Sequence, residues 1–249
     1  MNGLTIAHAA LLGAIQGVTE FLPVSSSGHL MLGRRLLGLP EADPALDAAV
    51  HLGTLGVLIW YFRRELLALP RRPALMRALI VATLVTAPLG FFLRDRAPQT
   101  LLFAGAGWLI SAGLLLATRW AANRKDEPGL GDAVRVGVAQ ALAVAPGISR
   151  LGSTFGVARL LGVETKAAAC FAYLLAIPPV LGQALFSLGD AGPGASLAAL
   201  AVGAVVAAVV GLAVVGRAVS WIEAGRAHLF AFYLAPLGAT VMLWNIYTP

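Results

Sequence analysis

Charged residues are scarce in this chain of 249 residues: Asp, Glu, Lys and Arg together make up 12%, whereas hydrophobic residues make up 59%. The mean hydropathy of +0.83 agrees with this imbalance. A water-soluble domain of ordinary composition carries about twice that share of charge. The composition therefore excludes an ordinary soluble domain and predicts an all-α polytopic membrane protein.

Cysteine is nearly absent as well. Cys170 is the single cysteine, so an intrachain disulfide is excluded, and its apolar helical setting favours a small buried side chain. The first residues lack a basic region before the apolar stretch, so we expect no removable signal peptide.

The few charges present are mostly basic, and the formal net charge is +6. In a soluble protein this balance would suggest a nucleic-acid partner. Here the arginines flank apolar segments, where they determine orientation in a membrane. We therefore expect a bilayer and no nucleic acid as the partner.

Apolar stretches long enough to cross the hydrocarbon recur along the chain. We expect spans near residues 45–62, 74–92, 100–120, 165–185, 196–215 and 228–247. The stretches 4–22 and 25–37 are separated by Pro23, which cannot continue a helix, and the serines from Ser25 onward are good N-cap residues. They are predicted to form a re-entrant hairpin of two half-helices, followed by a loop at 38–44.

The second half of the chain returns to the same plan at an offset of about 123 residues, half the chain length. Gln140, Pro146 and Arg159 stand in segments that echo those of Gln16, Pro23 and Arg35. The chain is thus predicted to be one integral membrane domain of two repeats, about 1–122 and 130–249. Each repeat has a re-entrant hairpin and three spans, so the second enters from the opposite face, as an inverted-topology repeat.

Hairpins that enter from opposite faces bring two polar tips together near the midplane. Half-helix N-termini, several hydroxyls and the guanidinium of Arg150 favour phosphate or pyrophosphate over a cation or a neutral sugar. The substrate-binding residues expected at these tips are Ser25, Ser27, Gly147, Ser149, Arg150 and Thr154.

Catalytic roles are predicted for Glu20, Ser26, His29 and Arg150. Glu20 would repel a polyanion unless a divalent metal lay between them, so we expect Mg²⁺, with Ca²⁺ as the alternative, held by Glu20 and Gln16. Ser26 and His29 lie three residues apart on one helical face, which suits a nucleophile with an acid–base partner. The plainer interpretation of Glu20 and Arg150 is a structural ion pair between the hairpins.

These motifs resemble those of the bacterial undecaprenyl-diphosphatase family, the bacitracin-resistance membrane phosphatases. The residues from Gln16 to His29 match the family segment Glu/Gln-x-x-x-Glu followed by Phe-Leu-Pro-Val-Ser-Ser-x-Gly-His. The residues from Pro146 to Thr154 match a second family segment, Pro-Gly-x-Ser-Arg-Ser-x-x-Thr. The resemblance implies metal-dependent hydrolysis of undecaprenyl diphosphate to undecaprenyl phosphate and phosphate, which recycles the lipid carrier for cell-wall polymers. It also implies the bacterial inner membrane and a site that opens toward the periplasmic side; a homodimer stays open.

The chain departs from the family pattern at several positions. Gln16 is the neutral variant of its motif, Leu151 replaces the second serine of Ser-Arg-Ser, Leu234 stands where relatives are expected to carry Arg, and Asp47 stands near an expected glutamate. A different polyprenyl diphosphate, or another lipid diphosphate, therefore remains open as the substrate.

A transporter or flippase of a phosphorylated lipid or another anion is the main alternative, because inverted repeats with broken helices are also the plan of secondary transporters. A hydrolase needs a positioned nucleophile and base, whereas a carrier needs only reversible binding. A membrane scaffold without catalysis would leave Glu20, Arg150 and the paired breaks unexplained.

The charge distribution gives a testable topology. With residues 63–77 and 123–135 in the cytoplasm and both termini outside, 13 of the 18 Lys and Arg residues lie on the cytoplasmic side. In a Cys170→Ser background, we expect Arg71→Cys to resist an impermeant thiol reagent in intact cells and to react after permeabilisation. Asp95→Cys, on the opposite side, is the control that reacts in intact cells. Labelling at position 71 in intact cells would contradict this topology.

Overall fold

The computed structural model describes residues 4–40, 42–190 and 196–247. Helices make up almost all of this part, which contains no strand apart from one isolated bridge between Lys125 and Val163. The all-α prediction is therefore confirmed. The predicted loop at 38–44 includes residue 41, and the two predicted repeats include residues 1–3, 191–195 and 248–249, which lie outside the described residues.

Within the described chain, five helical segments are long and apolar enough to cross a membrane. They are α5 (Pro73–Arg94), α6 (Leu101–Ala117) with η2 (Thr118–Trp120), α9 (Thr165–Gly189), α10 (Leu197–Glu223), and η3 (Ala227–Phe230) with α11 (Ala231–Tyr247). A sixth span is counted if α3 (Pro44–Tyr61) is joined to the bent segment formed by α4 (Arg63–Ala68) and η1 (Leu69–Arg71). The protein is thus a multi-pass membrane protein.

Two boundaries differ from the sequence prediction. α10 runs to Glu223, past the predicted end at residue 215, because a helix can extend beyond the hydrocarbon that a hydropathy window detects. The arginine-rich segment after Phe62 is also helical, at 57° to α3. Its first arginine, Arg63, lies 4.7 Å from the ring centroid of Trp60, so the bend begins with a cation stacked on an aromatic ring.

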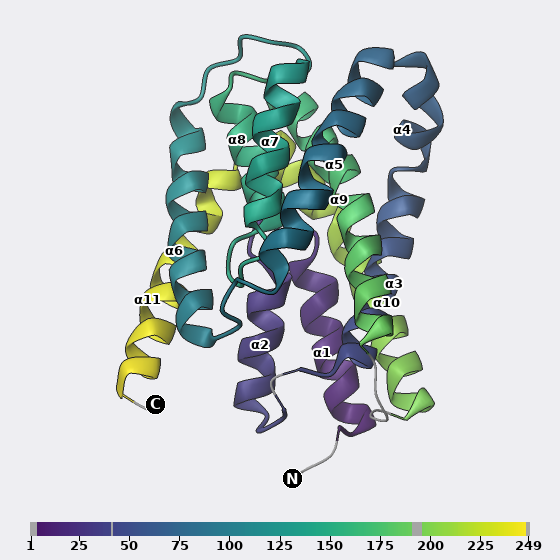
Figure 1. The fold of residues 1–249 in the computed structure, drawn as a ribbon, viewed down its shortest axis with the longest axis vertical. Helices are drawn as coiled ribbons and strands as arrows, with labels where there is room; N and C mark the ends of the chain where they lie inside the picture. Colours follow the sequence, from purple (N-terminus) through teal and green to yellow (C-terminus); the bar gives the residue numbers. More distant parts are fainter. Residues whose placement is uncertain (1–3, 41, 191–195, 248–249) are drawn as a thin grey trace.

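Two pairs of short helices complete the fold. α1 (Ile6–Thr19) and α2 (Ser26–Leu36) form the first pair, and α7 (Leu130–Leu142) and α8 (Arg150–Leu160) form the second. With lengths of 11 to 14 residues, none can cross the hydrocarbon alone. Figure 1 shows α1 and α2 in the lower half of the molecule and α7 and α8 in the upper half, with their breaks facing one another at mid-height. The predicted order of helix, break and helix is therefore present in both halves of the chain.

One face of α6 holds both breaks. The indole nitrogen of Trp108 donates to the carbonyl of Val24 at 3.0 Å. One helical turn later, the Ser111 hydroxyl donates to the carbonyl of Gly147 at 3.1 Å and accepts from the backbone N–H of Ser149 at 2.9 Å. Because residues three apart share a helix face, α6 aligns the two tips with each other.

Small residues let α6 approach the second break closely. A Cβ atom on Gly107 would lie 2.3 Å from the carbonyl oxygen of Pro146, and one on Gly147 would lie 1.9 Å from that of Ala104. Gly147 also has a φ of +80°, a left-handed conformation that glycine adopts without strain. The helix therefore packs directly on the backbone of the tip.

We predict that Gly107→Ala destabilises the protein by about 1–3 kcal/mol, because the added methyl group must displace the Pro146 backbone. Gly113→Ala is the matched control in the same helix, since a Cβ there meets no atom within 4 Å. The measurement is the thermal unfolding midpoint in detergent. Equal midpoints for the two variants would contradict the close packing of α6 on the second tip.

Candidate active site

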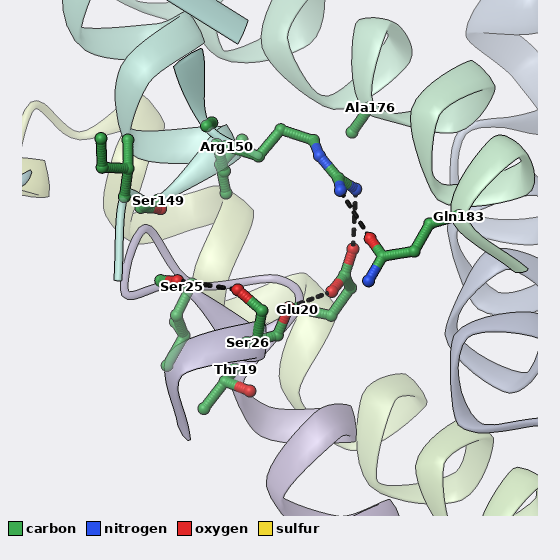
Figure 2. Close-up of a pocket in the computed structure, with 13 residues that line it drawn as sticks. Thr19, Glu20, Ser25, Ser26, Ser149, Arg150, Ala176 and Gln183 are labelled. Atoms are coloured by element: carbon green, nitrogen blue, oxygen red, sulfur yellow. Dashed lines mark hydrogen bonds and ion pairs between the residues drawn. The ribbon is translucent and has the colours of Figure 1, made fainter. Parts of the chain in front are cut away.

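A pocket lies where the two tips meet, and α9 contributes to its wall. Its lining residues are Thr19, Glu20, Leu22, Ser25, Ser26, Ser27, Ala143, Ile148, Ser149, Arg150, Leu151, Ala176 and Gln183. Figure 2 shows Glu20, Ser26, Arg150 and Gln183 gathered around this space from separate elements. Most of the predicted site residues are therefore brought together here.

Ser26 and Glu20 form the closest polar pair in the pocket. The Ser26 hydroxyl donates to Glu20 Oε2 at 2.6 Å, and the Gln16 side-chain amide donates to the same oxygen at 2.9 Å. Glu20 caps the end of α1 and Ser26 begins α2, so the break itself turns the two residues toward each other. A hydroxyl bonded to a carboxylate is the arrangement of a nucleophile with its general base.

Arg150 faces this pair from the second tip. Its Nη1 lies 3.9 Å from Glu20 Oε1, and its Nη2 donates to Gln183 Oε1 at 2.7 Å. The ion pair offered as the plainer interpretation is thus present, but at a separation longer than a direct hydrogen bond. The Arg150 side chain is 22% exposed, which leaves part of the guanidinium open to an anion.

Ser25 occupies the N-cap position of α2 but does not cap it. Its φ of +68° makes it the one non-glycine residue with positive φ in the described chain, and its side chain makes no capping bond. Instead its hydroxyl lies 3.3 Å from that of Ser27, and its carbonyl lies 2.8 Å from Nδ1 of His29. A strained residue of this kind is stable only where its surroundings fix it, and such residues cluster at functional sites.

Ser26 and His29 are not hydrogen-bonded to each other in the structure, and the catalytic role of His29 stays a prediction. His29 Nδ1 donates to the Ser25 carbonyl, and Nε2 lies 2.8 Å from the Tyr233 hydroxyl on α11. The ring packs between Tyr233 and Trp108 and is absent from the pocket lining. Both nitrogens are occupied, so the proton acceptor of Ser26 in this structure is Glu20, and His29 supports the strained turn.

Three predicted binding residues differ in their placement. Ser149 lines the pocket, but its hydroxyl caps α8 by accepting from Gly152 N–H at 3.0 Å. Gly147 and Thr154 are not among the lining residues; Gly147 packs on α6, and the Thr154 hydroxyl donates back to the Arg150 carbonyl at 3.0 Å. Hydroxyl groups in apolar helices commonly donate in this way to the carbonyl four residues earlier.

Sequence reasoning missed Gln183, which α9 brings to the pocket from a region without a motif. The available signal was a polar amide in an otherwise apolar span, since polar groups inside a membrane mark functional sites. Asp47, expected near a family glutamate, instead forms an ion pair with the buried Arg34 and joins α3 to α2.

Oxygen atoms suited to a divalent cation are few. Among the described residues, no three or more His, Cys, Asp or Glu side chains are grouped so that they could hold a metal ion. Gln16 is fully buried and its Oε1 has no hydrogen-bond partner, while its amide contacts the carboxylate of Glu20. The Glu20 carboxylate fits Mg²⁺, which completes its coordination with water and substrate phosphates, but the NH₂ group of Gln16 faces Glu20, so this amide must turn over for its oxygen to join the same cation.

The apolar spans define a multi-pass membrane protein, and its pocket joins a hydroxyl, a carboxylate and a guanidinium. The family model for the bacitracin resistance protein BacA matches residues 9–240. The chain belongs to this family, as its motifs predicted.

Curated relatives extend the match to nearly the full length. The undecaprenyl-diphosphatase of Desulforudis audaxviator (strain MP104C) is 37% identical over 248 residues, which cover 94% of this chain and 95% of the relative. That of Desulfatibacillum aliphaticivorans is 36% identical over 270 residues, covering 96% and 98%. That of Syntrophotalea carbinolica (strain DSM 2380 / NBRC 103641 / GraBd1) is 38% identical over 255 residues, covering 94% and 97%.

Proposed function

We propose that this protein is a membrane phosphatase that hydrolyses undecaprenyl diphosphate to undecaprenyl phosphate and inorganic phosphate. The observation that carries the proposal is the 2.6 Å bond between Ser26 and Glu20, facing Arg150 across one pocket. The family and the names of the relatives supply the lipid substrate. A carrier needs no hydroxyl held against a carboxylate, so the pocket favours hydrolysis over transport.

Arg150, Ser26 and Glu20 each have a separate role in the proposed hydrolysis. Arg150 binds the terminal phosphate, and the Ser26 oxygen attacks its phosphorus while Glu20 accepts the hydroxyl proton. The anhydride P–O bond breaks, and Glu20 gives the proton to the departing lipid monophosphate, which restores the carboxylate. Water then attacks the phosphoserine with Glu20 as the base, which releases phosphate and restores Ser26.

Glu20 and Gln16 are the residues that would hold a divalent cation, Mg²⁺ or alternatively Ca²⁺. When bound, the cation supplies positive charge that reduces the repulsion between the Glu20 carboxylate and the diphosphate. Gln16 contributes an oxygen without charge, so its cation affinity is below that of a site with two carboxylates.

The proposal includes an inverted-topology repeat in a single domain of the bacterial inner membrane, with the pocket opening toward the periplasmic side. The packing of α1 on α10 and of α7 on α5 supports the repeat, because these two pairs are equivalent under it. α3 with α9 and α6 with α11 are likewise pairs of equivalent helices in contact.

We predict that Arg150→Ala lowers phosphate release from undecaprenyl diphosphate on the order of 10²-fold or more, and that Arg150→Lys is also impaired. The reason is that the ammonium group of a lysine cannot form the bidentate hydrogen bonds that a guanidinium makes to phosphate. Phosphate release by purified protein in detergent is the assay. Arg64→Ala, which alters an exposed arginine of α4, is the control expected to retain activity. Near-normal turnover by folded Arg150→Ala would remove Arg150 from the mechanism.

We predict that Gln16→Glu lowers the Mg²⁺ concentration that gives half-maximal activity, because a second carboxylate strengthens cation binding. Glu20→Gln should nearly abolish turnover, since it removes both the charge beside the cation and the base for Ser26. The measurement is a Mg²⁺ titration of phosphate release for the wild type and both variants. An unchanged midpoint in Gln16→Glu together with an active Glu20→Gln would show that these residues are not metal ligands.

A further inference from the structure

Gln183 is a polar residue of the pocket that has no part in the mechanism above. Gln183 lies on α9 after Pro178 and Pro179, which remove two backbone donors from that helix. Its side chain reaches the pocket and accepts a hydrogen bond from Arg150 Nη2 at 2.7 Å. Figure 2 shows its amide beside both Arg150 and Glu20.

The chemistry of Arg150 fixes the orientation of this amide. A guanidinium has only N–H donors, so the amide oxygen of Gln183 must face it and the NH₂ group must point elsewhere. That nitrogen has no hydrogen-bond partner among the residues that the structure describes. Gln183 therefore offers free donors next to the guanidinium that binds phosphate.

Gln183 also determines where the guanidinium lies. Within the described chain, the polar side chains that contact it are Gln183 at 2.7 Å and Glu20 at 3.9 Å. The neighbouring Leu151 lines the pocket but supplies no polar atom. If the bond to Gln183 were lost, the attraction of opposite charges in a poorly solvated pocket would draw Arg150 onto Glu20. A closed pair would occupy both the anion-binding edge of Arg150 and the carboxylate that Ser26 needs.

We propose that Gln183 is a positioning and substrate-binding residue: its amide oxygen holds Arg150 away from Glu20, and its amide nitrogen donates to an oxygen of the bound diphosphate. This assignment rests on the proposed function and deepens it. It predicts that the effect of replacing Gln183 depends on whether Arg150 is present and on whether the new side chain is charged. A residue that only packs would show neither dependence.

The test uses Gln183→Leu, Gln183→Glu and the control Gln99→Leu. Gln99 is an exposed glutamine that does not line the pocket. Two quantities are measured on full-length protein: the binding of inorganic pyrophosphate by equilibrium dialysis, and kcat and KM for phosphate release from undecaprenyl diphosphate. A hydrogen bond to a charged group is lost in Gln183→Leu, so we expect pyrophosphate affinity and kcat/KM to fall about ten- to a hundred-fold. Gln99→Leu should match the wild type.

Gln183→Glu separates positioning from packing. A glutamate can still accept the bond from Arg150, so the thermal unfolding midpoint should not fall, but its charge faces the diphosphate and KM should rise at least as much as in Gln183→Leu. In an Arg150→Ala background, Gln183→Leu should cause a smaller loss than in the wild type, because the positioning role disappears with Arg150 and only the direct bond from the amide to the diphosphate is left to lose. Equal losses from Gln183→Leu in both backgrounds, or wild-type pyrophosphate affinity in Gln183→Glu, would overturn the assignment.

Different results would contradict the phosphatase activity and the role of Gln183. If pyrophosphate binding depends on Gln183 but the wild type releases no phosphate from the lipid, the enzymatic proposal is overturned and the binding role of Gln183 stands. If the wild type hydrolyses the lipid while the Gln183 variants bind and turn over normally, the role of Gln183 is overturned and the phosphatase stands.

Discussion

The hydrogen bonds from α6 to the two broken helices are the constraint on which the pocket depends. A break in a helix exposes backbone N–H and C=O groups, and inside a bilayer there is no water to pair with them. Trp108 pairs with the first tip and Ser111 with the second. Tyr173 on α9 adds a bond of 2.8 Å to the carbonyl of Phe21. The irregular backbone that carries the site can therefore exist at mid-height because neighbouring helices supply its missing partners.

This support also explains why Ser26 and Glu20, to which we assign catalytic roles, are already oriented. Ser25 keeps a strained backbone because His29 binds its carbonyl and Trp108 binds that of Val24. The strain turns Ser26 toward Glu20 at the start of α2. No large rearrangement is then needed for the hydroxyl to meet its base, and preorganised polar groups of this kind are the main source of transition-state stabilisation in enzymes.

Much of this arrangement could be predicted from the sequence, because Pro23 and Pro146 mark the breaks and hydropathy marks the spans. Glu20, Ser26 and Arg150 stood out as polar residues in apolar surroundings, and the structure places all three in one pocket. The partner of Ser26 could not be predicted in this way. Helical periodicity puts His29 on the same face, but it does not show that a strained carbonyl and Tyr233 compete for the imidazole. Gln183 was missed for a related reason: its role depends on a contact between remote segments, and no local pattern encodes that contact.

The position of Gln183 links the Arg150 guanidinium to a helix outside the two tips. Leu151 gives Arg150 no polar partner on its own helix, so the hydrogen bond that orients the guanidinium comes from α9. The same helix packs on α3 and, through Tyr173, holds the backbone of the first tip. Any shift of α9 would thus move the Arg150 side chain and the turn that carries Glu20 together. Because Arg150 and Glu20 belong to different hairpins, a common attachment to α9 sets their separation, which is 3.9 Å between Arg150 Nη1 and Glu20 Oε1.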